Sequence, residues 1–163
     1  MKKGINRVSD FVNHIAVAVA CAAILATALS CFLQVFTRYV LNNSLSWTEE
    51  LCRYMAIVVY MFGFSIATKH GSNPKIDLLS NLLKGKGKIV HALFCFAATC
   101  ICGGFIVFYG IKALPMGARS VSSVLKIPAS YMYWVIIISQ LFCIIHSISG
   151  IVNDVEKLRQ KEG

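Results

Sequence analysis

Four long apolar runs, each about the length of a membrane span, constrain this sequence more than any other feature. The first and fourth runs contain no charged residue, the second opens with charges, and the third is apolar until Lys112. A transmembrane helix needs about 20 mostly apolar residues. We therefore predict an all-α integral membrane protein, a single domain over residues 1–163. Its four transmembrane helices are expected at about 14–36, 47–68, 89–113 and 128–152.

The composition supports a lipid environment. Hydrophobic residues make up 57% of the chain and charged residues only 14%, whereas charged residues supply about 25% of a typical soluble domain. The net charge of +9 could indicate a nucleic-acid partner, but such proteins cluster their basic groups on one folded face. Here the basic residues flank the apolar runs, as topology determinants do. We expect no nucleic-acid partner.

The distribution of basic residues predicts the orientation. Cytoplasmic loops carry the excess of lysine and arginine. The amino terminus, the loop after the second run and the carboxyl terminus hold eleven of the 16 basic residues, and the other two loops hold five. Both termini are therefore predicted to be cytoplasmic. A secretory signal peptide is the alternative for the first run, but its apolar stretch is longer than the ~7–15 residues of such a signal.

The predicted cytoplasmic loop has helix signals of its own. Asn73 suits a helix N-cap and Pro74 the first helical position, and leucines then gather on one flank. We predict a short amphipathic helix over about 74–84, lying on the membrane surface. Lys84, Lys86 and Lys88 would then contact anionic lipid headgroups. A solvated basic loop without lipid preference is the open alternative.

Small residues recur along one stripe of the first run. Ala18, Ala22, Ala26 and Ser30 are spaced by four, a pattern that lets membrane helices approach closely. We expect no polar site deep within the helices. The seven cysteines lie in or beside the apolar runs without C-x-x-C spacing, so we interpret them as small buried hydrophobic residues. Neither a metal nor another cofactor is expected.

A charged cluster marks the start of the second run. Ser46 and Glu49 have the spacing of a capping box. Glu49 and Glu50 lie four and three residues before Arg53, so both can pair with it on one helix face. One hypothesis assigns a coupling ion or proton to these carboxylates. We favour a neutralised structural network that fixes the first hairpin and its outer surface, formed by Arg38, Trp47, Glu49, Glu50 and Arg53.

At this cluster the sequence resembles the small membrane subunit of the tripartite ATP-independent periplasmic (TRAP) transporters. The resemblance extends over nearly the whole chain. It departs from the family pattern at Pro74 and Lys75, where a histidine is common, and in lacking a second proline in the last run. The residues that carry it are Phe36, Arg38, Tyr39, Trp47, Thr48, Glu49, Glu50, Arg53, Tyr54, Gly63, Gly71, Ile76, Asp77, Leu78, Leu79, Ser123, Leu125, Ile127, Pro128 and Tyr133.

The resemblance implies a non-enzymatic, multi-pass subunit of the bacterial inner membrane. The expected partners are a large membrane subunit, which holds the substrate and sodium sites and moves as an elevator, and a periplasmic substrate-binding protein. Substrates would be organic acids such as sialic acid or C4-dicarboxylates. The small subunit would anchor the static scaffold and add to the surface that docks the binding protein.

Two other functions stay open from the sequence. A haem-binding electron-transfer subunit is one, because His14, His70, His91 and His146 fall near the same ends of the four runs. An autonomous small exporter is the other, but it would need a carboxylate in the middle of a helix. The available candidates, Glu49 and Glu50, lie at a helix end.

Overall fold

The computed structural model describes residues 2–42, 45–70 and 86–160. The described residues form four helices and confirm the predicted all-α fold. The bounds are α1 Lys2–Tyr39, α2 Ser46–His70, α4 Lys86–Arg119 and α5 Ser130–Gln160.

All four helices are long and apolar enough to cross a membrane. They are also longer than the sequence predicted at most ends. With 38 residues, α1 is about 57 Å long at 1.5 Å per residue, well beyond a hydrocarbon core of about 30 Å. It begins at Lys2 rather than near His14 because no proline interrupts the polar first turns. Similarly, α4 continues through Pro115 to Arg119.

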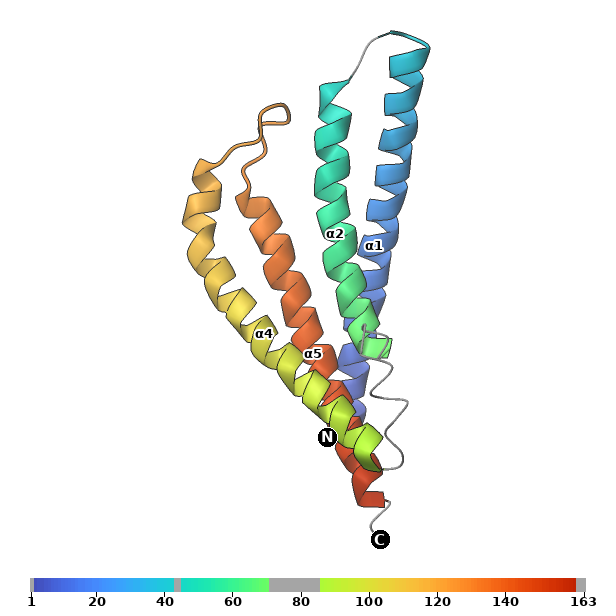
Figure 1. The fold of residues 1–163 in the computed structure, drawn as a ribbon, viewed down its shortest axis with the longest axis vertical. Helices are drawn as coiled ribbons and strands as arrows, with labels where there is room; N and C mark the ends of the chain where they lie inside the picture. Colours follow the sequence, from blue (N-terminus) through green and yellow to red (C-terminus); the bar gives the residue numbers. More distant parts are fainter. Residues whose placement is uncertain (1, 43–44, 71–85, 161–163) are drawn as a thin grey trace.

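The helices form two antiparallel hairpins, α1 with α2 and α4 with α5 (Figure 1). In the view down the shortest axis they lie side by side in the order α4, α5, α2 and α1. The hairpins approach each other at the lower end of the view and diverge toward the upper end. Helix α4 packs mainly against α5, and α5 also contacts α2 and α1. The four described helices therefore form an open row, in which much of the surface of α4 and α1 has no partner among residues 2–42, 45–70 and 86–160.

The α1–α2 hairpin has a small apolar core. Ala16, Ala20 and Ala23 of α1 pack against Val58 and Phe62 of α2. The small side chains let the two backbones approach. Alanines thus pack α1 closely against α2, but they are not the residues of the predicted stripe.

The predicted stripe of Ala18, Ala22, Ala26 and Ser30 lies elsewhere on α1. Ala18 and Ala22 are exposed, Ala26 is half-buried and Ser30 is buried. At 100° per residue, the first two face away from α2. Their role in helix packing therefore remains a prediction that concerns another chain.

The start of α1 and the end of α5 lie at the same end of the molecule (Figure 1). This agrees with the prediction that both termini share one side of the membrane, and the assignment of that side to the cytoplasm remains a prediction. The amphipathic helix predicted at 74–84, with Lys84, lies outside the described residues. Lys86 and Lys88 belong to the first turn of α4, and their side chains lie outside the description.

Candidate functional site

A carboxylate at the start of α2 connects the two hairpins at their diverging ends. One oxygen of Glu50, Oε2, accepts hydrogen bonds from the backbone amides of Leu125 at 2.7 Å and Val124 at 3.2 Å. Both amides belong to the loop between α4 and α5. Bonds from a neutral donor to an ionised carboxylate are stronger than bonds between neutral groups. Glu50 therefore ties α2 to the loop of the second hairpin.

The α4–α5 loop is shaped to present these amides. Ser120 accepts a bond from the Ala129 amide at 2.8 Å, and the Ser122 amide donates to the Ile127 carbonyl at 2.9 Å. These bonds flank an antiparallel bridge between Val121 and Pro128. Because Pro128 belongs to this bridge, α5 begins at Ser130 and not at the predicted Pro128. The residues after Leu125 turn the chain back, and Lys126 has a φ of 56°. The two amides thus lie at the tip of a small hairpin, next to α2.

The second carboxylate of the cluster binds within its own hairpin. Glu49 Oε1 accepts a hydrogen bond from Gln34 Nε2 of α1 at 3.0 Å. The start of α2 at Ser46 agrees with the sequence, but the predicted capping box is not formed. Instead Thr48 bonds back to the Leu45 carbonyl through its hydroxyl at 2.6 Å and its amide at 3.2 Å. Glu49 therefore binds α1 and does not cap the start of α2.

The predicted pairing of the glutamates with arginine is wrong for the described part of the chain. Arg53 is exposed and forms no ion pair with either carboxylate, and Arg38 forms none either. Arg38 lies in the last turn of α1, where a positive charge complements the helix dipole. Trp47 is exposed at the start of α2, as an interfacial anchor would be. The carboxylates are satisfied by amide donors instead, which spacing along one helix could not reveal.

A second polar cluster lies at the converging end and was missed by the sequence analysis. His146 of α5 is only 2% exposed, and its Nδ1 atom lies 2.8 Å from Ser9 Oγ of α1. Next to it, Lys69 of α2 forms an ion pair with Asp10 of α1 at 2.7 Å. The Lys69 ammonium also lies 3.5 Å from the Ser9 carbonyl oxygen. Three helices are joined here by polar side chains.

The same cluster continues toward the ends of α1 and α5. Asn6 accepts a hydrogen bond from the Ser149 hydroxyl at 2.8 Å and lies 3.3 Å from Asn153. Together with Ser9, Asp10, Lys69, His146 and Gly150, these residues line a cavity of about 200 Å³. We call this group the terminal polar cluster. The expectation that no polar site lies deep within the helices is wrong for His146, which is buried in α5, whereas the other members lie toward the helix ends.

The polar spacing in the sequence could have indicated this cluster. Asn6 and Ser9 are three residues apart on α1, and His146, Ser149 and Asn153 are three and four apart on α5. Such spacing places side chains on one helix face. Each stripe is unremarkable alone, and the meeting of the two follows only from tertiary packing.

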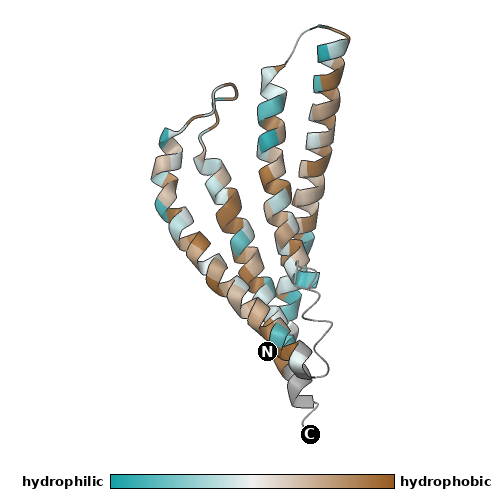
Figure 2. Ribbon diagram, viewed as in Figure 1, coloured by the Kyte–Doolittle hydropathy of each residue, from teal (hydrophilic) through white to brown (hydrophobic). Residues whose placement is uncertain are grey.

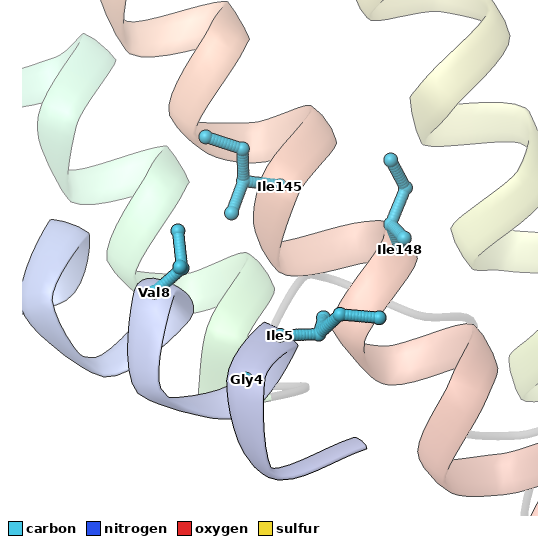
Figure 3. Close-up of a pocket in the computed structure, with 5 residues that line it drawn as sticks. All are labelled: Gly4, Ile5, Val8, Ile145 and Ile148. Atoms are coloured by element: carbon cyan, nitrogen blue, oxygen red, sulfur yellow. The ribbon is translucent and has the colours of Figure 1, made fainter. Parts of the chain in front are cut away.

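An apolar pocket of about 420 Å³ lies between α1 and α5 near the same end (Figure 3). Ile5 and Val8 of α1 and Ile145 and Ile148 of α5 line it, with Gly4 at its floor. None of these described lining residues has a side chain that could orient a polar solute. The pocket can accept an apolar group such as a lipid chain, but it lacks the features of a substrate site.

Three of the four histidines considered for haem have other contacts in the structure. His146 Nδ1 bonds to Ser9, and His14 Nδ1 lies 2.7 Å from the Asp10 carbonyl of its own helix. His91 lies beside Cys95 on α4. Over residues 2–42, 45–70 and 86–160, no three His, Cys, Asp or Glu side chains gather as a metal site would require. His146 thus packs α5 against α1, whereas the contacts of His14 and His91 lie within their own helices.

Comparison with known proteins accounts for this combination of four spans and polar hairpin ends. The family model of the tripartite ATP-independent periplasmic transporters, DctQ component, matches residues 27–157. The chain belongs to this DctQ family. Both carboxylates of the diverging end and the loop that binds Glu50 lie inside the matched region, whereas the amino-terminal part of the terminal polar cluster precedes it.

Individual relatives are similar at modest identity. The sialic acid TRAP transporter small permease protein SiaQ of Vibrio cholerae is 27% identical over 120 residues, which cover 74% of this chain and 69% of the relative. A putative TRAP transporter small permease protein of Haemophilus influenzae is 28% identical over 131 residues, covering 72% and 81%. The sialic acid TRAP transporter permease protein SiaT of Haemophilus influenzae is 29% identical over 79 residues, covering 48% and 13%.

Membership in the DctQ family, with four helices that can span a membrane, makes this chain a multi-pass membrane protein and a small permease subunit of a TRAP transporter. DctQ components serve transport and are not enzymes. The expectation of a non-enzymatic subunit is therefore confirmed.

Proposed function

We propose that this chain is the static scaffold subunit of a sodium-coupled TRAP transporter for organic acids in a bacterial inner membrane. It broadens and anchors the large elevator subunit, and its diverging end contributes to the surface that docks the periplasmic substrate-binding protein. Sialic acid and C4-dicarboxylates are the substrate classes considered. Sialic acid has the support of two relatives named for it.

The observation that carries the proposal is the open row of helices. Helix α4 packs mainly on α5, so its other faces have few partners among the residues that the structure describes. They carry a stripe of large exposed side chains, Phe94, Ile101, Phe105 and Phe108. A chain that transported by itself would need to enclose a polar path, whereas a scaffold needs broad apolar faces for another membrane protein. Figure 2 shows the hydrophobic residues distributed along the helices and not confined to one enclosed seam.

A large partner is also supported by the match to SiaT. The similar segment is 79 residues and makes up 13% of that permease protein. A sequence like this one therefore occurs as a minor portion of a much longer permease. The same arrangement with two separate chains would pair this subunit with a large one.

The outer stripe of α1 is the surface for which we propose close contact with the large subunit. Exposed Ala18 and Ala22 lie on it, and small residues let a neighbouring membrane helix approach. Ala20, two residues away, is buried against α2 instead. Neighbouring alanines on one helix thus serve two different contacts, one within the chain and one proposed between chains.

This difference provides a test with an internal control. Ala22→Leu should leave the thermal unfolding of the isolated chain unchanged and reduce its co-purification with the large membrane subunit. Ala20→Leu should lower the chain's own stability by about 1–3 kcal/mol, because it overpacks a buried position. Full retention of the large subunit by Ala22→Leu would assign that stripe to lipid.

Reconstitution tests the transport role. Proteoliposomes that contain this chain alone should show no sodium-dependent uptake of organic acid. Uptake should require the large subunit and the binding protein as well. Uptake by this chain alone would refute the scaffold proposal and favour the autonomous exporter. A Soret absorbance band in the purified chain would instead favour the haem-binding alternative.

A further inference from the structure

We propose that Cys31 of α1 and Cys52 of α2 are a redox-convertible pair that closes to an intramolecular disulfide and locks the first hairpin. The two Sγ atoms are 3.5 Å apart, although the residues are 21 positions apart in the chain. Both are free thiols in the structure. The proposal goes beyond the scaffold role and does not depend on it.

The register of the hairpin holds the two thiols opposite each other. Three residues further along α1 is Gln34, and three residues back along α2 is Glu49, and these two are hydrogen bonded at 3.0 Å. Antiparallel helices meet in this way when both pairs lie on the shared face. The Cys31–Cys52 contact is therefore part of a ladder between the helices and not an isolated approach of two side chains.

The direction of the Cys52 side chain supports the same geometry. Its Sγ atom lies 3.9 Å from the carbonyl oxygen of Thr27, one turn before Cys31 on α1. Cys52 therefore points at the backbone of the facing helix. Closing the bond requires the sulfurs to move together by about 1.5 Å, to the S–S length of about 2.05 Å. Rotation about the two Cα–Cβ bonds moves sulfur atoms without moving the helices.

The two thiols also lie three residues from the exposed polar contact between Gln34 and Glu49, at the end of the hairpin where water and a small oxidant can reach them. Cys31 is exposed and Cys52 is partly exposed. Cys52 directly precedes the exposed Arg53, in the charged segment that begins α2. Charged groups in membrane helices gather at the interface with water. The sequence interpretation of the cysteines as buried hydrophobic residues holds for Cys143, which is buried, and does not hold for Cys21, Cys31 and Cys102, which are exposed on the chain.

The chemistry is thiol–disulfide exchange with a small disulfide as oxidant. The thiolate of the more exposed Cys31 attacks one sulfur of the oxidant and releases one small thiol, leaving a mixed disulfide. The thiolate of Cys52 then attacks Cys31 Sγ and releases the second small thiol. The two protein thiols lose two protons and two electrons, and the oxidant is reduced to two thiols.

The test counts free thiols in the full-length chain. Isolated membranes are reduced or treated with oxidised glutathione, and the protein is then denatured, alkylated and weighed by mass spectrometry. The reduced chain should take up seven alkyl groups, one for each cysteine. The oxidised chain should take up five, because one bond consumes two of its seven thiols. Peptide mapping should identify the Cys31–Cys52 link.

Serine variants make the count specific. After oxidation, Cys31→Ser should take up six groups, since it cannot close the bond and lacks one of the seven cysteines. Cys52→Ser should take up five and carry one glutathione, because the mixed disulfide on Cys31 then has no second thiol to resolve it. Cys21→Ser is the matched control on α1 and should take up four after oxidation, because six thiols remain and the pair still closes. The oxidised wild type should also unfold at a higher temperature than the reduced form. The oxidant should not raise the unfolding temperature of Cys52→Ser.

Three results would overturn the proposal. One is an uptake of seven groups after oxidation. Another is a loss of two thiols that persists in Cys31→Ser or Cys52→Ser. The third is a disulfide between two chains through Cys31, visible as a dimer on a non-reducing gel.

Discussion

The two ends of this helical row are held together in different ways. At the converging end, the terminal polar cluster joins α1, α2 and α5 through side chains on each helix, and His146 is almost fully buried among them. At the diverging end, the described contact between the hairpins runs from Glu50 to two backbone amides of a loop. At the converging end the helices are packed as in a protein core. At the diverging end one carboxylate contact, from Glu50 to the amides of Val124 and Leu125, connects the hairpins, and we call this contact the latch.

The difference indicates where the subunit can adjust. Removing a buried polar group leaves its partner without a hydrogen bond in a low dielectric, so the converging end should tolerate change poorly. A partly exposed carboxylate can exchange its amide donors for water at a smaller cost. We therefore expect the converging end to define the fold and the diverging end to adapt to partners.

The largest effect is expected at the converging end. His146→Ala should lower the free energy of unfolding by about 3 kcal/mol, because it leaves a cavity and removes the partner of Ser9. His14→Ala is the matched control, since His14 is exposed and bonds only to its own helix. It should change stability by less than about 0.5 kcal/mol. Unfolding in mixed micelles of denaturing and mild detergent measures both, and equal effects would remove the distinction between core and surface histidines.

A close helix contact at the diverging end should give the next largest effect. A Cβ atom on Gly117 would lie 2.5 Å from the Tyr133 ring and 3.0 Å from the Ser130 amide nitrogen, whereas one on Gly104 would meet nothing within 4 Å. Gly117→Ala should therefore cost about 1–3 kcal/mol, and Gly104→Ala should be neutral or stabilise by up to about 1 kcal/mol. Thermal unfolding compares the two. Equal stability would mean that the start of α5 moves away without cost.

Loss of the Glu50 contact should change the distance between the two hairpins more than it changes the stability of the chain. Glu50→Ala removes the acceptor for Leu125 and Val124, so the hairpins should separate further and vary more in distance at this end. Spin labels at Ser46 and Val121, in a chain without native cysteines, report that distance. Glu49→Gln is the matched control, because the Glu49 partner lies within the same hairpin. An unchanged distance distribution in Glu50→Ala would show that other contacts hold the loop.

The sequence predicted the four spans because hydropathy is a local property. Each apolar run is readable without knowledge of its neighbours, and the described helices include all four. The predicted ends of the helices were less accurate. Polar residues such as Asn6 and Ser9 mark a helix as leaving the membrane in a sequence, but in the fold they lie against another helix.

The partners of the charged residues could not be predicted from spacing along one helix. Glu50 and Arg53 are correctly spaced for a pair, yet the carboxylate binds amides that lie 74 and 75 positions away in the chain. Those amides carry no side-chain signature, because every residue except proline has one. The terminal polar cluster and the cysteine pair were missed for the same reason, since both depend on contacts between helices.

The smallest effect concerns the shape of the loop that Glu50 binds. Lys126 has a φ of 56°, a left-handed conformation that costs a residue with a Cβ atom about 1 kcal/mol relative to glycine. Lys126→Gly should relieve that strain and raise the unfolding temperature slightly, while Lys126→Val should lower it. If the loop is shaped to hold the latch, Lys126→Val should also lengthen the distance between labels at Ser46 and Val121, as Glu50→Ala does. A lowered unfolding temperature without any change in that distance would mean that the strained residue stabilises the loop alone, and that Glu50 follows the loop rather than depending on its shape.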